Sequence, residues 1–150
     1  MATLTRRTYD AAIATRAAFD QARALVAAME KLSGSDLDAF RAQVESLAPA
    51  PRRGGPGGGG FGGGGGFGGA GGQPAAPPTL FSASTTLMTA AMAMQGADVA
   101  PTTGQVAACE RARAQSAEVM AKWTALKTTG LAALNGKRRA AGQPTLALPE

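Results

Sequence analysis

The sequence has no histidine, a single cysteine and few aromatic residues, which make up 5% of its 150 positions. Without histidine, the chain lacks the most common general base and the most common metal ligand. One cysteine can neither close a disulfide within the chain nor supply a multi-thiolate metal site. We therefore expect no catalytic, cofactor-binding or metal-binding residues, no small-molecule substrate, and a protein that is not an enzyme.

Large aliphatic residues are also scarce, because 35 of the 67 apolar residues are alanine. Leucine, isoleucine, valine and phenylalanine together number 23, too few for a sizeable core in either half of so short a chain. No apolar run is long enough to cross a bilayer, and no hydrophobic stretch follows the first arginines as it would in a signal peptide. We expect no membrane span.

Glycine is abundant, and 15 of the 21 glycines lie between residues 54 and 72. Together with six prolines they make residues 49–78 a segment that cannot offset its ordering entropy by burying apolar area. We predict a disordered linker at 49–78. It separates a first helical hairpin at 1–48 from a second at 79–150.

Apolar residues at three- and four-residue spacing predict two helices before the linker, at about 3–33 and 36–48. The stripe of the first helix contains Leu4, Tyr9, Ile13, Ala17, Phe19, Ala22, Val26, Met29 and Leu32. The stripe of the second contains Leu37, Phe40, Val44 and Leu47. Gly34 fits the position just after a helix end, and Ser35 fits the next N-cap. The pair forms either a hairpin or a kinked rod.

Two further helices are predicted after the linker, at about 79–95 and 103–141. The stripe of the third helix contains Leu80, Ser84, Leu87, Met88, Ala91 and Met94. The stripe of the fourth contains Val106, Cys109, Ser116, Met120, Trp123, Leu126, Leu131 and Leu134. Four amphipathic segments predict an all-α protein, either an antiparallel four-helix bundle or two helical hairpins joined by the linker.

Helix ends are marked by capping residues. Either Thr79 or Ser82 suits the start of the third helix, and Thr102 with Gln105 resembles a capping box at the start of the fourth. Gly130 is a candidate interruption of the fourth helix. Residues 142–144, Gly-Gln-Pro, end it.

A few single residues are candidates for a special role. Cys109 lies on the apolar stripe and is best interpreted as a small core residue, because no histidine is present to activate a thiolate. Tyr9 and Trp123 are interpreted as anchors of the core rather than as platforms for a ligand. Met88, Met92 and Met94 indicate core packing, with an adaptable docking face as the alternative.

The formal net charge is +5, but the basic residues are spread along the chain. Only Lys137, Arg138 and Arg139 form a dense cluster, whereas nucleic-acid binding usually needs a larger basic stripe or patch. We therefore expect no nucleic-acid partner. The carboxylates are equally scattered, and no two of them are placed for acid–base catalysis.

Two segments after the linker carry a family resemblance. Residues 95–102 read Gln-Gly-Ala-Asp-Val-Ala-Pro-Thr, about twenty positions before Trp123. Residues 131–135 read Leu-Ala-Ala-Leu-Asn, and 138–144 read Arg-Arg-Ala-Ala-Gly-Gln-Pro. This pattern resembles the C-terminal helical region of bacterial sortilin-type β-propeller proteins, often described as BNR-repeat or glycosyl-hydrolase-like. The propeller itself and its signal peptide are absent from this sequence.

The resemblance implies a helical appendage of a larger extracytoplasmic protein, and no catalytic residue is carried over from the propeller. We therefore expect a non-enzymatic interaction or assembly module that meets a protein partner or a second copy through its apolar helix faces. One alternative is a Gly/Phe-rich protein associated with nucleic acid or condensates, which Phe61 and Phe67 would indicate. Another is a fragment of a glycan-processing sortilin-like protein whose activity lies outside this chain.

Overall fold

The computed structural model describes residues 2–50, 77–95 and 100–149. Its elements in chain order are α1 (Ala2–Met29), α2 (Ser35–Leu47), α3 (Leu80–Gln95), α4 (Thr103–Ala125), the π-helical turn η1 (Leu126–Gly130) and α5 (Leu131–Ala140). The elements α4, η1 and α5 follow one another without a break and make one rod roughly 57 Å long. The described part contains helices and no strand, which confirms the prediction of an all-α protein.

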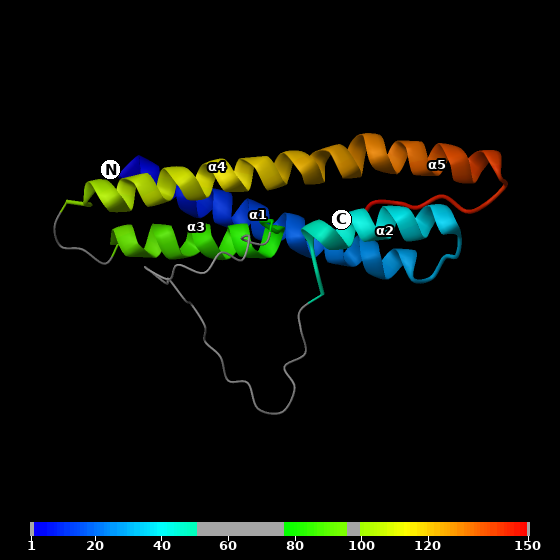
Figure 1. Ribbon diagram of the computed structural model, residues 1–150, viewed down its shortest axis with the longest axis horizontal. Coiled ribbons are helices and arrows are strands. Elements are labelled where there is room, and N and C mark those ends of the chain that lie inside the picture. Colours follow the sequence, from blue (N-terminus) through cyan, green and yellow to red (C-terminus); the bar gives the residue numbers. More distant parts are fainter. Residues whose placement is uncertain (1, 51–76, 96–99, 150) are drawn as a thin grey trace, which may run out of the picture.

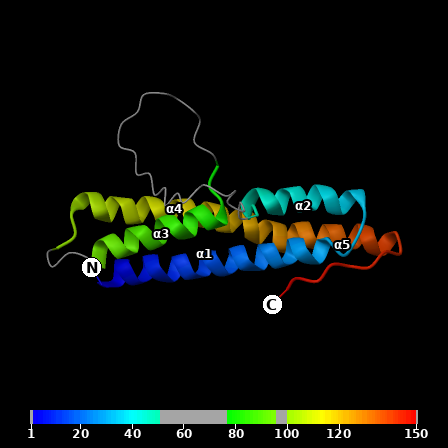
Figure 2. The same ribbon diagram turned by 90° about the horizontal axis from the view of Figure 1, so that it is seen from below.

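The helices form a long, narrow bundle (Figure 1). The α4–η1–α5 rod and α1 run side by side, while α2 and α3 follow one another along them, both antiparallel to α1 (Figure 1, Figure 2). The four helical rods therefore make a bundle that is three helices thick, because α2 and α3 share one position in the cross-section. We call the part built with α2 the α2 half and the part built with α3 the α3 half.

The turn after α1 reverses the chain. The helix ends at Met29 rather than at residue 33, because the next residues form a tight turn in which Leu32 N–H donates to the Met29 carbonyl at 3.1 Å. Gly34 has a φ of +148°, a conformation that favours glycine. It also holds the N-cap position predicted for Ser35, so that prediction is wrong. The two helices pack on each other as a hairpin, which decides between the two alternatives.

The other helix boundaries follow the capping residues. Thr102 and Gln105 form a full capping box: the Gln105 N–H donates to Thr102 Oγ1 at 3.2 Å, and the Thr102 N–H donates to Gln105 Oε1 at 2.8 Å. Thr79 and Ser82 exchange the same two kinds of hydrogen bond before α3. Sequence therefore predicts both starts correctly, since these caps need only residues three positions apart.

The α2 half has a core of large side chains. Its buried residues include Leu25, Val26, Met29, Leu37, Phe40, Val44, Leu47, Trp123, Leu131, Leu134 and Leu146. All four apolar residues predicted for the second helix are buried. Both Ala48, just after α2, and Leu80, the first residue of α3, belong to this same cluster. The residue that follows α2 and the residue that begins α3 therefore pack into one shared core.

The α3 half has a core of small and polar side chains. Its buried residues include Thr8, Ala12, Thr15, Ala83, Ser84, Leu87, Ala91, Met94, Cys109, Ala112 and Ser116. Thr15 donates to the Ala11 carbonyl at 2.7 Å, so the Ser116 hydroxyl at 2.8 Å donates to Thr15. Small side chains let helices approach closely, and threonine is tolerated because its hydroxyl is satisfied within its own helix.

The π-helical turn η1 shifts the inward-facing positions of the rod by one residue. Buried positions along α4 recur in steps of three and four, ending at Trp123, and the series would continue to 126 and 130. The next buried residues are instead Leu131 and Leu134. Each lies one position further along the chain than an uninterrupted α-helix would place it, because the wider π turn holds an extra residue. A Cβ on Gly130 would lie 3.1 Å from Phe40 Cε2, so this glycine lets α2 pack closely here.

The linker predicted at 49–78 falls almost entirely on residues outside the described ranges, and so do Phe61 and Phe67. Within the described ranges, no helix combines the length and apolar character that a membrane crossing requires.

Candidate functional site

Cys109 is a core residue, as predicted. It is fully buried, and its Sγ lies 3.0 Å from Met94 Sδ and 3.5 Å from the Ala90 carbonyl oxygen. Such a thiol behaves as a small hydrophobic group with a weak donor. In the part of the chain that the structure describes, no three cysteine or acidic side chains gather closely enough to hold a metal ion.

Tyr9 is not a core anchor, and the sequence interpretation of this residue is wrong. Its side chain is 44% exposed, and Ile13, one turn later, is 51% exposed. Thr8, Ala12 and Thr15 take the inward positions of α1 instead. The predicted stripe was based on the hydrophobicity of the side chains. In this half, however, the helices pack so closely that only small side chains fit between them.

Large apolar side chains are exposed on α3 as well. Phe81 is 47% and Met92 63% exposed, whereas Met94 is buried and Met88 packs at the edge of the small-residue cluster. Core packing is therefore confirmed for Met94, whereas Met92 lies on the surface. Phe81 also packs on Phe19, with ring centroids 5.5 Å apart, and Arg16 lies over both rings at 5.5 Å.

These exposed residues belong to the α3 half, and the two helices that carry them, α1 and α3, border one furrow. Tyr9 and Ile13 are neighbours on α1, and Phe81 and Met92 share one face of α3, because their spacing is close to whole helical turns. The furrow between these two helices has a volume of about 250 Å³ and is lined by Ala12, Arg16, Ser84, Thr85, Met88 and Thr89. We call Tyr9, Ile13, Phe81 and Met92 the apolar face.

The basic triplet is not a continuous basic surface. Arg138 is only 2% exposed: its Nε donates to the Pro144 carbonyl at 2.6 Å and its Nη1 to the Ser33 carbonyl at 3.4 Å. The Asp36 carboxylate lies 3.8 Å from the same Nη1. Arg138 therefore ties α5 to the C-terminal tail and to the turn between α1 and α2, and only its two neighbours face solvent.

The residues behind the family resemblance shape the C-terminal tail. Gly142 has a φ of +68° and ends α5 in a Schellman motif, in which the Gln143 N–H donates to the Arg138 carbonyl at 2.8 Å. Asn135 then holds the returning chain, because its amide accepts from the Leu146 N–H and donates to the Leu146 carbonyl, both at 2.8 Å. In this chain, the residues that carry the family resemblance therefore end α5 and hold the C-terminal tail against it.

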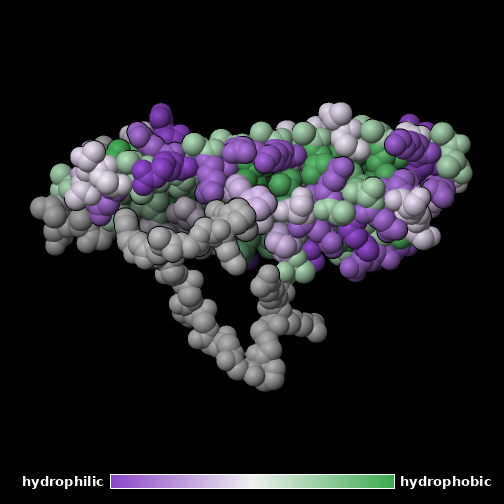
Figure 3. Space-filling view, in the orientation of Figure 1, coloured by the Kyte–Doolittle hydropathy of each residue, from purple (hydrophilic) through white to green (hydrophobic). Residues whose placement is uncertain are grey.

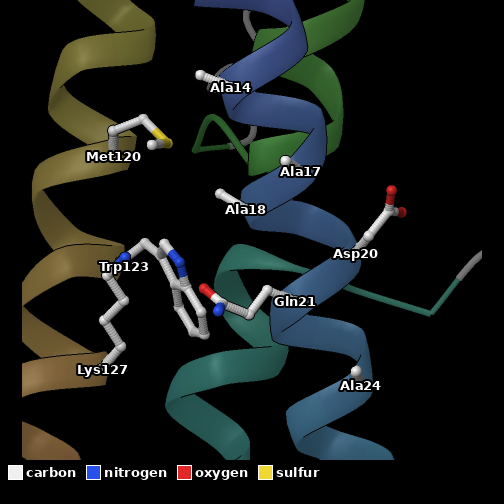
Figure 4. Close-up of a pocket in the computed structure, with 9 residues that line it drawn as sticks. All are labelled: Ala14, Ala17, Ala18, Asp20, Gln21, Ala24, Met120, Trp123 and Lys127. Atoms are coloured by element: carbon white, nitrogen blue, oxygen red, sulfur yellow. The ribbon is translucent and has the colours of Figure 1, made fainter. Parts of the chain in front are cut away.

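A second furrow lies between α1 and α4, with a volume of about 630 Å³. Its lining residues are Ala14, Ala17, Ala18, Asp20, Gln21, Ala24, Met120, Trp123 and Lys127 (Figure 4). We call it the Trp123 groove. Figure 4 shows the indole between the two helices, next to the Gln21 carboxamide and the Lys127 side chain.

Trp123 is fully buried, which confirms its interpretation as a core anchor. Its indole Nε1 is nevertheless the one buried side-chain nitrogen or oxygen, among the described residues, that has no hydrogen-bond partner. The sequence shows the burial but not this missing partner, because the partner depends on how far α1 lies from α4. Buried indole nitrogens usually find an acceptor.

A third furrow, about 450 Å³ in volume, follows the border between α2 and η1 and includes Leu47, Ala125 and Leu126. Figure 3 shows hydrophobic surface between charged surface where the α4–η1–α5 rod passes α2. Leu47 belongs to the core of the α2 half and Leu126 packs against it, so this furrow lies at the margin of that core.

The acidic residues form local ion pairs. Asp20 lies 3.4 Å from Arg16 on the same helix, and Glu118 lies 3.2 Å from Lys122. Such exposed pairs one turn apart contribute little to stability. They show which charges near the furrows already have a partner.

Comparisons of the chain with protein-family models, with curated proteins and with solved structures find no match. The resemblance to the C-terminal region of sortilin-type proteins therefore stays a prediction from the sequence.

Proposed function

We propose that this protein is a non-enzymatic helical module that docks onto another protein or onto a second copy of itself through the apolar face. The observation that supports this proposal most directly is the exposure of Tyr9, Ile13, Phe81 and Met92 within one half of the bundle. Single exposed apolar residues are ordinary, but a group of them on two helices that pack together marks an interaction surface.

The chemistry of the face suits protein docking. Aromatic and methionine side chains are enriched at the centres of interfaces, and methionine adapts its shape to different partners. Arg16, held over the two phenylalanine rings, supplies a charged edge beside the apolar residues. The small core beneath is consistent with helices that need an outside partner to complete their burial.

We further propose that the module is an appendage of a larger extracytoplasmic β-propeller protein, as the family resemblance implies. The resembling residues Asn135, Arg138 and Gly142 are occupied in holding the tail, so they support a structural part rather than a reaction. Nucleic-acid binding receives less support, because Arg138 is removed from the surface of the basic triplet.

Sedimentation of the isolated 150-residue chain tests the docking proposal, since the apolar face then has only a second copy to meet. We expect reversible self-association in the micromolar to millimolar range. Ile13→Ser with Met92→Ser should weaken it about fivefold or more, because two exposed apolar side chains leave the interface. Ala93→Ser, an exposed position on the same helix, is the matched control.

A chain that stays monomeric throughout this range contradicts docking onto a second copy and leaves another protein as the partner of the apolar face. Self-association that the paired substitution leaves unchanged contradicts the use of this face.

A further inference from the structure

We propose that the partner of the apolar face is a second copy of this chain, and that the two α1 helices pair antiparallel about a two-fold axis that passes Ile13. This inference rests on the docking function proposed above and names its partner and its geometry. A two-fold interface must be complementary to itself, because the same surface of both copies takes part in it. The charges of α1 and the exposed apolar residues of α3 both meet this requirement around Ile13.

Ile13 lies at the middle of an exposed stripe of α1. Arg6 and Asp20 lie seven residues before and seven residues after it. Because seven residues are nearly two helical turns, the three side chains point in almost the same direction. The side chains of Arg6 and Asp20 are 84% and 63% exposed, and Ile13 is 51% exposed. The stripe is therefore open to a partner along about four turns of the helix.

The charges of this helix have opposite signs on the two sides of Ile13. In an antiparallel pair centred on Ile13, Arg6 of one copy lies level with Asp20 of the other, and the same contact occurs twice. Asp10 and Arg16, each three residues from Ile13, repeat the arrangement with the signs exchanged. A parallel pair in register would instead bring arginine against arginine and aspartate against aspartate. The charge pattern therefore selects the antiparallel orientation.

The ion pairs within α1 leave these groups able to take a second partner. Arg6 Nε lies 4.0 Å from Asp10 Oδ2, and Arg16 Nε lies 3.4 Å from Asp20 Oδ1. Each contact uses one carboxylate oxygen, and a carboxylate can accept from more than one arginine. Across the proposed axis, each pair meets the opposite pair of the other copy. Four alternating charges then form a network, which contributes more than an isolated surface pair.

The exposed apolar residues of α3 fit the same axis. Phe81 packs on Phe19, with ring centroids 5.5 Å apart, so it lies level with a position six residues after Ile13. Met92 follows eleven residues later, about 16 Å further along a helix that runs antiparallel to α1 (Figure 2). It therefore lies level with a position about five residues before Ile13. The axis brings Phe81 of one copy level with Met92 of the other, and thioether sulfur and aromatic rings attract one another.

Charge reversal tests the pairing in sedimentation of the 150-residue chain. Arg6→Glu puts two carboxylates opposite each other at both ends of the interface, and Asp20→Arg does the same with two arginines. Each variant alone should self-associate about tenfold more weakly. An equimolar mixture of the two should associate nearly as strongly as the unchanged chain, because every contact across the axis then joins opposite charges. Arg7→Glu, an exposed position of α1 outside the stripe, is the control and should change little.

A cross-link locates the axis itself. Ile13→Cys places one thiol of each copy at the axis, where oxidised glutathione should join the two chains through a disulfide. Such a bond requires the two Cα atoms to lie within about 7 Å of each other. Ala14→Cys is the control, since this position is also exposed but is turned by about 100° around the helix. It should cross-link at least fivefold less, and the native Cys109 is buried.

The pairing and the docking function fail in different ways. Self-association that Ile13→Ser with Met92→Ser weakens, but in which the two charge variants do not complement each other, overturns the antiparallel pairing and leaves the docking function standing. A chain that stays monomeric up to millimolar concentration overturns the second copy as the partner. Equal cross-linking of Ile13→Cys and Ala14→Cys shows that the axis does not pass Ile13.

Discussion

The two halves of this bundle solve the same packing problem with different side chains. The α2 half fills its centre with leucine, phenylalanine, valine and tryptophan, whereas the α3 half is filled mainly by alanine, serine and threonine. Where the core is made of large residues, the apolar side chains are inside. Where it is made of small ones, Tyr9, Ile13, Phe81 and Met92 are left on the surface. The size of the core residues thus determines in which half large apolar side chains lie on the surface.

The sharpest test of this comparison applies one substitution to both halves. Leu25 and Leu87 are both fully buried, the first among large neighbours and the second against Ala12 and Ala112. We expect Leu25→Ala to lower the free energy of unfolding by about 4 kcal/mol and Leu87→Ala by about 2 kcal/mol, because small neighbours close in on the space. Urea denaturation measures both, and equal losses would contradict the distinction.

Arg138 tests how strongly the α2 half depends on a buried charge. Arg138→Met keeps much of the apolar stem but leaves the carbonyls of Ser33 and Pro144 without their donor. We expect a loss of about 3 kcal/mol in the free energy of unfolding. The control is Arg139→Met, since Arg139 is exposed; a similar loss there would show that the cost lies in the charge of α5 and not in the buried contacts.

The hydroxyl pair of Thr15 and Ser116 tests the polar core of the α3 half. Thr15→Val leaves the Ser116 hydroxyl without its acceptor and should cost about 1 kcal/mol. Adding Ser116→Ala should recover most of this loss, because both polar groups are then gone. A double-mutant cycle by thermal or urea denaturation measures the coupling, and simple additivity would mean that the pair contributes nothing.

The junction between the halves gives the smallest expected effect. Since Ala48 and Leu80 belong to the same core cluster, the chain between them has little distance to cover. Replacing residues 51–76 by about ten glycine and serine residues, which can span roughly 30 Å, should change the free energy of unfolding by less than about 1 kcal/mol. Loss of cooperative unfolding in this variant would show that the long segment itself is needed.

The helices and most of their ends could be predicted from the sequence because their causes are local. Gly34 separates α1 from α2, Thr102 with Gln105 begins α4, and Gly142 ends α5. Each of these acts through its own backbone conformation or through a residue three positions away. Local chemistry of this kind is visible in the sequence.

The inward face of α1 before Phe19 could not be predicted, because its causes lie in other helices. Tyr9 and Ile13 are the most hydrophobic choices, but the closely packed α3 leaves room only for Thr8, Ala12 and Thr15. The burial of Arg138 has the same kind of cause, since its partner Ser33 is 105 positions away. The missing acceptor of Trp123 depends on helix spacing in the same way.

The extra residue in η1 determines how this chain can gain or lose length. In an ordinary helix, deleting one residue rotates everything that follows by roughly 100° and turns buried leucines toward water. Deleting one residue between 127 and 129 would instead remove the surplus and leave Leu131 and Leu134 in phase with Trp123 on a regular α-helix. The π turn therefore behaves as a one-residue insertion, at the position in the rod where a deletion is best tolerated.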